Sequence, residues 1–441
     1  MPEKLRRLVG SVWFVTLVAF AIRMVVVAFL YQGQMNPRRD HFPFGYEAGR
    51  IARAIASGRG FSDPLSVQTG ATAWMAPVYP YLVAGVFKIS GIYTARSAII
   101  LLTLNSLFSA LACVPVFLMA RESFGQRVAI WAGWSWALYP YAIYLSAAWI
   151  WETCLTALLL SLEFLFTLRL QNSTRVAPWA GYGLLWGATA LTNPAVLSLM
   201  PLLAGWACYR LHQRGRRYGL QAAVATLALV IVVTPWFVRN YEVFHRVVPF
   251  RDNFWLEVHV GNNGDTSHSA LEARHPSVSP IEEEEYNRLG ELNYMAEKRR
   301  ESIEFIRTRP RWFAGVTLRR IVHTWTGFWS LPANGRLHEP WDPEEPFDPA
   351  NIALCASLTA VAIGGLLMAF RRGSAVAWPY ALALLGFPVV YYVTNTDSRY
   401  RHPIDPELIV LAAYACATFF SKRHEATEET GGWTQFHSLG P

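Results

Sequence analysis

Long apolar runs alternate with three hydrophilic stretches along this chain, and that alternation limits its fold more than any other feature. A helix that crosses a membrane needs roughly 20 apolar residues, because backbone groups in lipid must find their partners within the same element. Runs of about that length occupy residues 9–31, 97–120, 128–148, 150–170, 219–238, 352–370 and 375–393. The sequence therefore predicts an all-α polytopic membrane protein.

Composition agrees with this interpretation. Hydrophobic residues make up 53% of the 441 and charged residues only 16%, whereas roughly 25% of an ordinary soluble domain is charged. Shorter apolar segments lie at 76–91, 179–193, 195–209 and 405–420. Together the runs predict about ten to twelve spans. The first follows MPEKLRR and is too long for a cleaved signal peptide, so we expect an uncleaved signal anchor.

The positive-inside rule orients the loops, because cytoplasmic loops carry the excess of Lys and Arg. Basic residues cluster near the N-terminus, at 210–217, at 371–372 and at 422–423. We therefore expect cytoplasmic termini in a plasma (inner) membrane of bacterial type, with 33–75, 239–350 and 394–406 outside. The basic loop at 121–127 conflicts with this count. Either the segment 76–91, interrupted by Pro77 and Pro80, is re-entrant, or the 121–127 loop breaks the rule.

Four parts follow from this pattern. Residues 1–238 form an N-terminal transmembrane module with a first loop at 33–75, and 239–350 form an extracytoplasmic loop with amphipathic helices. Residues 351–420 return to the membrane, and 421–441 form a cytoplasmic tail. Helical spacing in EEEEYNRLGELNYMAEKRRESIEFIRTRP predicts an amphipathic helix in the large loop.

The first outer loop contains a candidate general base. Its carboxylates are Asp40, Glu47 and Asp63, and only Glu47 begins a helical stretch, AGRIARAIASG. A carboxylate near a helix start is favoured by the helix dipole, and above a membrane it could take a proton from an incoming hydroxyl. The alternative is a helix-start acid paired with Arg50 or Arg53.

The last outer loop carries SRYRHPIDP, a dense set of hydrogen-bond donors just before the final span. Arginine binds phosphate oxygens with a planar, always-charged fork. The sequence therefore predicts that Arg399, Arg401, Tyr400 and His402 bind the phosphate in the head group of a phospholipid-like substrate. Interfacial anchoring of the last helix is the alternative.

Further candidates lie at the ends of other spans. Arg239 ends a span on the predicted outer side and could join the phosphate site. Asn262 and Asn263, between two glycines, could bind substrate through their amides or simply close a turn. Glu152, in WIWET, faces outward in the preferred topology and could approach the site.

Cofactors and partners of other classes find little support. The eleven histidines include no HExxH motif, so no metal or other cofactor is predicted, although a divalent metal stays an open alternative. The five cysteines all lie in apolar runs and indicate packing. The net charge of +8 comes from short inter-helix loops, which speaks against a nucleic-acid partner and for contact with membrane lipid.

Several motifs make the chain resemble the GT-C superfamily of membrane glycosyltransferases, in the style of its protein-mannosyltransferase and aminoarabinose-transferase branch. GYEAGRIARAIASGRGFSDP is similar to that branch's first loop, TGATAWMAPVYP at 69–80 to its next element, and Arg399, Tyr400 and Pro403 to its RY-x-x-P element. An Asp-Glu pair precedes the IAR-like helix in the mannosyltransferases, where this chain has Phe44 and Gly45. Glu47 is therefore the substitute candidate for the base, with Asp40 as the fallback.

The resemblance implies a GT-C-like bundle and an inverting transferase. It would move a sugar from a polyprenyl-phosphate donor to a lipid, glycan or protein acceptor at the extracytoplasmic face. Two alternatives from other classes stay open. One is a transporter or flippase for a lipid-linked saccharide, which predicts substrate-coupled charges near the bilayer midplane and for which Arg23 within the first span is the support in the sequence. The other is a non-catalytic scaffold for envelope assembly.

Overall fold

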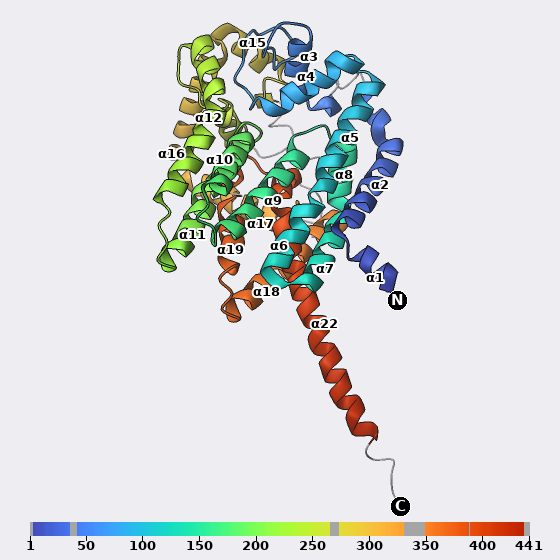
Figure 1. Ribbon diagram of the computed structural model, residues 1–441. Helices are drawn as coiled ribbons and strands as arrows, with labels where there is room; N and C mark the ends of the chain where they lie inside the picture. Colours follow the sequence, from blue (N-terminus) through green and yellow to red (C-terminus); the bar gives the residue numbers. More distant parts are fainter. Residues whose placement is uncertain (1–2, 36–41, 265–272, 330–348, 388, 436–441) are drawn as a thin grey trace, which may run out of the picture.

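A computed structural model describes residues 3–35, 42–264, 273–329, 349–387 and 389–435. In this part of the chain all regular structure is helical, and the only β-type pairing is an isolated bridge between Ser62 and Ala71. The predicted all-α class is confirmed. Figure 1 shows a bundle of helices, a cap of shorter helices at one end, and a long C-terminal helix that leaves the bundle at the other end.

The described residues include seven helical segments that are long and apolar enough to cross a membrane. These are Val12–Met35, Ala95–Phe124, Thr153–Leu170, Pro194–Gln213, Gly219–Phe244, Pro349–Arg371 and Arg399–Phe420. The polytopic character is thus confirmed, and the total of ten to twelve spans stays a prediction. The bundle consists of α1 (Glu3–Val9), α2 (Val12–Leu30), α5 (Ala95–Leu111), α6 (Cys113–Phe124), α7 (Gln126–Ala137), α8 (Pro140–Ala148), α9 (Thr153–Leu170), α10 (Val176–Ala190), η4 (Pro194–Leu199), α11 (Met200–Gln213), α12 (Gly219–Phe244), α18 (Pro349–Arg371), α19 (Ala377–Gly386), α20 (Val389–Val393), η5 (His402–Ile404) and α22 (Asp405–Gln435).

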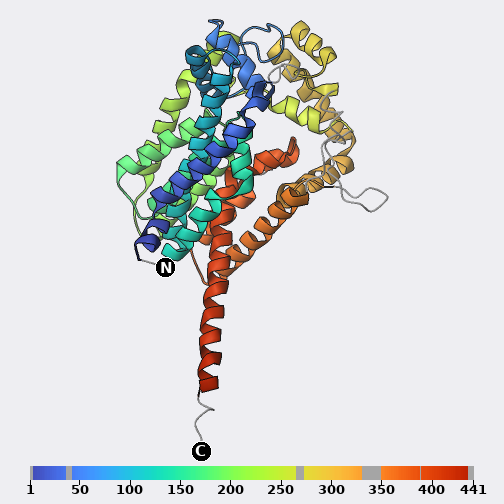
Figure 2. The same cartoon turned by 90° about the vertical axis from the view of Figure 1, so that its right-hand side faces the viewer.

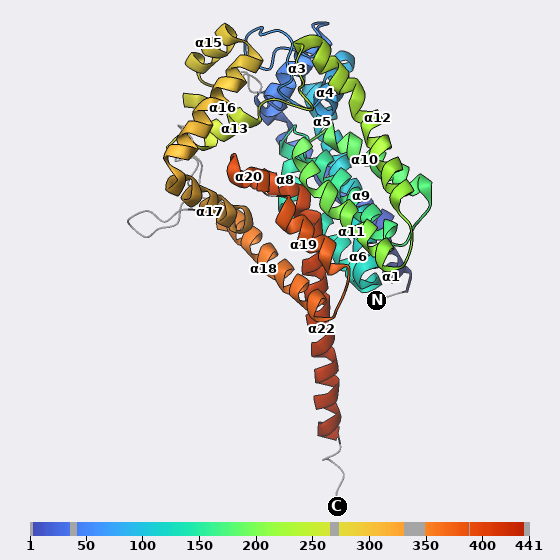
Figure 3. The same ribbon diagram turned by 90° about the vertical axis from the view of Figure 1, so that its left-hand side faces the viewer.

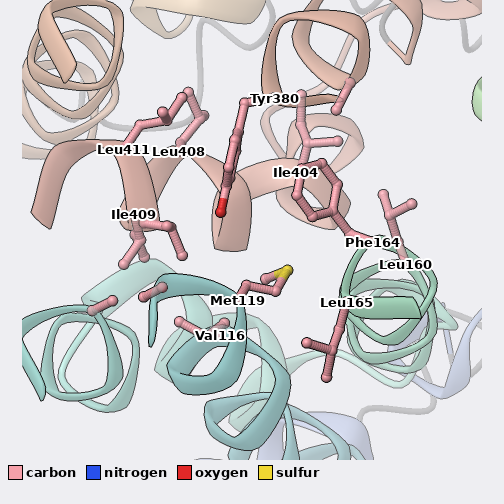
Figure 4. Close-up of a cluster of buried hydrophobic side chains, with 14 of the residues drawn as sticks. Val116, Met119, Leu160, Phe164, Leu165, Tyr380, Ile404, Leu408, Ile409 and Leu411 are labelled. Carbon is pink, nitrogen blue, oxygen red and sulfur yellow. The ribbon is translucent and has the colours of Figure 1, made fainter. Parts of the chain in front are cut away.

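The core of the bundle joins its first and last thirds. Figure 4 shows side chains of α6 and α9 facing those of α19, η5 and α22. Tyr380 lies among them fully buried, and its hydroxyl is 3.1 Å from the Ser123 hydroxyl. Because helices gain little from the hydrophobic effect within lipid, close packing of this kind holds the bundle together.

Two glycines let helix backbones touch. A Cβ on Gly183 of α10 would lie 2.0 Å from the Ala225 carbonyl oxygen of α12, and one on Gly365 of α18 would lie 2.1 Å from that of Leu411 on α22. Small residues at such crossings are typical of membrane helices. The α10–α12 and α18–α22 pairs therefore depend on having no side chain at these positions.

The basic turns gather at the end of the bundle that carries α1. Trp134 Nε1 donates to the Val9 carbonyl, and Arg169 Nη2 lies 2.7 Å from Glu122 Oε1. Arg214 in turn donates to the Gln171 carbonyl at 2.8 Å. Figures 2 and 3 show that the long C-terminal helix also leaves the bundle at this end.

This arrangement bears on the conflict over the 121–127 turn. Helices α5 and α6 follow each other as one long segment that ends at this turn, on the α1 side. Helix α4 (Val78–Ser90) instead packs beside α3 (Glu47–Ala56) at the opposite end, as Figure 1 shows. Its 13 residues would cover roughly 20 Å, less than a bilayer core. This position favours the alternative in which 76–91 does not cross, and the topology of this segment stays a prediction.

The cap at the opposite end combines parts of all three predicted outer loops. It contains η1 (Tyr31–Met35), η3 (Phe42–Phe44), α3, α4, α13 (Phe254–Gly261), α15 (Pro280–Leu289), α16 (Glu291–Thr308), α17 (Pro310–Thr326) and α21 (Ser398–Arg401). Leu65 and Trp74 of the first loop pack against Tyr286, Tyr294 and Met295 of the second. The predicted amphipathic helix is two helices, because Gly290 breaks it with a φ of +74°.

Candidate functional site

A tight turn places Glu47 at the start of α3. Gly45 has a φ of +87° and Tyr46 one of +46°, so the chain reverses just before the helix. A Cβ on Gly45 would lie 2.5 Å from the Ile150 carbonyl oxygen. This close approach explains why no acid stands at position 45, where the mannosyltransferase pattern has one. It also brings the start of α3 against the Trp149–Glu152 segment.

The Glu47 carboxylate is almost buried and is held by the second outer loop. Ser277 Oγ donates to Glu47 Oε1 at 2.9 Å, and His275 Nε2 lies 4.0 Å from the same oxygen. The Tyr46 hydroxyl donates to the Ser277 carbonyl at 2.5 Å. The alternative of an ion pair with Arg53 is not what the structure has, and the Arg50 guanidinium lies over the Tyr46 ring.

A second carboxylate lies at the same site. Glu152 precedes α9, and its Oε2 is buried with no hydrogen-bond partner. Burial raises the pKa of this carboxyl, the positive charges of Arg399 and Arg251 act in the opposite direction, and the charge of Glu47 adds to the rise. Glu152 therefore interacts electrostatically with Glu47 and with two arginines.

Arg399 faces this site from the last outer loop. Asp397 caps α21 by accepting the Arg399 backbone N–H at 3.0 Å. The Arg399 guanidinium lies 4.2 Å from the centre of the Trp151 ring, and its Nε is 3.5 Å from Asp397 Oδ2. Tyr400 stacks on Tyr391, with ring centres 4.5 Å apart. Arg399 and Tyr400, two of the four residues predicted to bind phosphate, thus lie on the side of Glu152.

The next two residues of that set turn away from it. Arg401 Nε donates to Asp405 Oδ1 at 2.9 Å, and another of its nitrogens donates to Thr359. His402 is fully buried, with Nδ1 3.2 Å from Asp405 Oδ2 and its ring stacked on Trp136. Both side chains therefore join helices inside the bundle.

Arg239 holds the first outer loop in place. Its guanidinium donates to the Thr72 carbonyl at 2.7 Å and to the Phe61 carbonyl at 2.8 Å. It also lies over the Trp236 ring. These contacts use the donors that the sequence assigned to a phosphate.

The two asparagines bond mainly to backbone. Asn262 donates to the Val393 carbonyl at 2.9 Å and accepts from Arg320. Asn263 donates to the Val260 carbonyl at 2.7 Å. Asp40, the fallback base, lies outside the described residues.

Sequence reasoning missed Arg251, His275, Ser277 and Tyr391. Arg251 interacts electrostatically with both Glu152 and Tyr391. Its position in an outer loop, where basic residues are uncommon, is a signal that could have found it. Nothing local marks Ser277, which lies 230 residues from Glu47 in the sequence.

Within the described ranges no group of three or more His, Cys, Asp or Glu side chains could hold a metal ion. The expectation of no cofactor stays a prediction.

The fold is shared with solved membrane glycosyltransferases, although no protein-family model and no curated protein matches the chain. The AglB oligosaccharyltransferase of Archaeoglobus fulgidus, in complex with an inhibitory peptide and a dolichol-phosphate, superposes with a TM-score of 0.54 at 17% identity. The match covers 95% of this chain and 52% of AglB. The apo form of that enzyme gives 0.54 at 16% identity over the same shares of the two chains.

ArnT from Cupriavidus metallidurans bound to undecaprenyl phosphate gives a TM-score of 0.39 at 14% identity, covering 89% of this chain and 77% of ArnT. The chain spans about half the length of AglB. At these identities the likeness to AglB shows the fold alone, and it agrees with the fold that the resemblance to the GT-C superfamily implies.

Proposed function

We propose that this chain is an inverting glycosyltransferase. It moves a sugar from a polyprenyl-phosphate donor to a lipid, glycan or protein acceptor at the extracytoplasmic face of a plasma (inner) membrane. One observation carries the proposal above the others. The start of α3 with Glu47 packs against the segment that carries Glu152, Arg399 lies over Trp151 of that segment, and the charges of Glu47, Arg251 and Arg399 all act on Glu152, at the end of the bundle opposite its basic turns.

The carboxylate can remove a proton from the acceptor, and the arginines can stabilise the phosphate that leaves. Glu47 removes the proton from the acceptor nucleophile, a role worth roughly 10² to 10⁴ in rate. The acceptor atom attacks the anomeric carbon, and the bond from that carbon to the phosphate oxygen breaks. Arg399 and Arg251 then stabilise the negative charge on the released polyprenyl phosphate. Attack from the face opposite the leaving group inverts the anomeric centre.

The charges of Glu47, Arg399 and Arg251 all act on Glu152. A raised pKa favours its protonated form, so we assign it a second polar contact to the sugar or its phosphate, made by donating a hydrogen bond. Tyr400, stacked on Tyr391 beside Arg399, orients the donor. Arg401, His402 and Arg239 act by positioning, because their donors hold helices and loops rather than facing Glu152.

The dolichol-phosphate in the AglB complex supports a lipid phosphate as the donor type.

Arg23 offers little for the transporter alternative. Its guanidinium is fully buried and donates to Ser109 Oγ and to the carbonyls of Ala19 and Ala137 at 3.0 Å. These hydrogen bonds join helices and occupy the donors that a substrate in the membrane would need.

The test is transfer by the purified protein from a panel of polyprenyl-phosphate sugars. We expect release of polyprenyl phosphate by the wild type, a loss of at least a hundredfold in Glu47→Gln, and a comparable loss in Arg399→Ala. Arg288→Ala is the matched control, because Arg288 is exposed and its nearest acid is Glu285. Donor binding without turnover would favour a flippase. Activity that survives Glu47→Gln would move the search for the base to Asp40 or Glu152.

A further inference from the structure

The second outer loop supplies two side chains to the same oxygen of Glu47. Ser277 Oγ donates to Oε1, and His275 Nε2 faces that oxygen at 4.0 Å. The other carboxylate oxygen, Oε2, accepts no hydrogen bond from the described residues. It also does not belong to the fully buried polar atoms that lack a hydrogen-bond partner. The two oxygens of the carboxylate therefore differ in what they can do.

The backbone fixes which nitrogen of His275 carries a proton. The Ser277 backbone N–H donates to His275 Nδ1 at 3.2 Å, so Nδ1 must offer a lone pair. A neutral imidazole that accepts at one nitrogen carries its hydrogen on the other. The N–H of His275 is therefore at Nε2, the nitrogen that faces Glu47. The ring is almost buried and packs edge-on against Trp74, with ring centres 5.7 Å apart.

Two titratable groups from other elements act on the Glu47 carboxylate. Among the described residues these are His275, from the segment before α15, and Glu152, from the segment before α9. On α3 itself, the Arg50 guanidinium lies 4.1 Å from the centre of the Tyr46 ring. Tyr46 in turn ties the same loop to α3 through the Ser277 carbonyl.

We infer that His275 and Ser277 are positioning residues for the general base. Resting on the proposed function, this inference assigns the two oxygens of Glu47 separate roles. Oε1 accepts a hydrogen bond from Ser277 and lies 4.0 Å from His275 Nε2, and these two contacts fix the direction of the carboxylate. Oε2 faces the acceptor and receives its proton as the acceptor attacks. After transfer the proton leaves Oε2 to water, and the contacts of Oε1 are restored.

The test measures the protonation of Glu47 without using transfer. A water-soluble carbodiimide reacts with protonated carboxyl groups, and mass spectrometry of the full-length protein in detergent follows labelling of Glu47 against pH. We expect the labelling midpoint to rise by about one pH unit in Ser277→Ala, since a hydrogen bond to the charged form favours that form. His275→Gln, which replaces the ring that faces the same oxygen at 4.0 Å, should shift it in the same direction. His212→Gln, at the opposite end of the bundle, is the matched control and should leave it unchanged.

The outcomes separate this inference from the proposed function. Folded variants that share the wild-type midpoint would overturn the inference, even if transfer is observed. If His275→Gln shows no cooperative melting transition, the midpoint of Ser277→Ala decides. Absence of transfer in the wild type would contradict the proposed function. The labelling midpoints would still test whether His275 and Ser277 position Glu47. A structural role alone would lower the melting temperature and leave the midpoint in place.

Discussion

At the scale of single residues, side-chain direction separates the site from its supports. Arg399 and Arg401 are two positions apart, yet Arg399 lies over Trp151 beside Glu152 whereas Arg401 bonds to Asp405 inside the bundle. Residues two apart on a helical turn point in different directions. Neighbouring arginines of one motif therefore need not share a role.

The contacts of Asp405 with Arg401 and His402 can be used to test whether these two side chains support the bundle. Asp405→Asn removes a buried charge that both Arg401 and His402 contact. Breaking a buried pair costs about 3 to 5 kcal/mol, so we expect a large fall in melting temperature in detergent. Asp397→Asn is the control, because its side chain is 43% exposed and surface pairs contribute about 0 to 1 kcal/mol. Equal effects of the two variants would contradict the assignment.

Gly45 provides another test. Gly45→Ala adds a Cβ at 2.5 Å from a backbone oxygen and keeps a residue at positive φ, so something must shift. Gly58 also has a positive φ, +82°, but a Cβ there would meet nothing within 4 Å. We expect Gly58→Ala to destabilise by about 1 kcal/mol and Gly45→Ala by clearly more. Thermal unfolding compares the two directly.

At the scale of elements, packing between helices and loops holds the site above the bundle. The first outer loop is fixed from two sides. Arg239 of α12 binds its carbonyls, and Glu291 of α16 accepts from Thr72 Oγ1 and the Ala73 N–H, each at 2.5 Å. The loop therefore connects a membrane helix to the cap, and the position of Glu47 depends on both contacts.

The acid beside Glu291 predicts how stability varies with pH. Burial raises the pKa of the Asp252 carboxyl well above its usual range, and the charge of Glu291 adds to the rise. The folded state therefore binds this proton more tightly than the unfolded state. The stabilisation is complete below about pH 4 and is lost as the pH rises toward the folded-state pKa. Melting temperatures should fall less with rising pH in Asp252→Asn than in the wild type. Parallel curves would contradict this.

The crossing of α10 and α12 is tested by substituting its glycine. Gly183→Ala places a Cβ 2.0 Å from a backbone oxygen of α12, whereas the Cβ of Gly181→Ala would meet only Phe166 at 3.7 Å. Overpacking costs about 1 to 3 kcal/mol, so Gly183→Ala should separate the helices and lower the melting temperature. Gly181→Ala should leave it near the wild-type value. The reverse order would show that this crossing does not hold the bundle.

At the scale of the whole molecule, the two ends of the bundle have different characters. One end gathers α1 and the basic turns, and the other carries the cap with Glu47 and Glu152 (Figures 1 and 3). Because basic turns favour the cytoplasm, the proposed site would face the opposite side of the membrane.

Cysteine labelling tests this orientation. We expect Gln126→Cys, in the turn between α6 and α7, and Val67→Cys, in the exposed part of the first outer loop, to lie on opposite sides of the membrane. A membrane-impermeant maleimide added to intact cells should label the second and not the first, in a variant without the five native cysteines. Labelling of both from outside would contradict the arrangement.

The sequence by itself determined the class of the molecule. Apolar runs as long as a bilayer is thick leave few folds other than a helical bundle, and the motifs around Glu47 and Arg399 carried the resemblance to the GT-C fold. Its local patterns also located the helix that begins at Glu47. Such features are readable because they depend on residues close together in the chain.

Only the tertiary structure decided which of these residues share a site. Glu47 meets Ser277 at a separation of 230 positions, and Arg251 joins Glu152 from a third segment. The same packing turned Arg401, His402 and Arg239 toward helices and loops. A sequence motif specifies only residue types and their spacing along the chain. The direction of a side chain depends instead on where its helix begins and on the surfaces that distant segments bring against it.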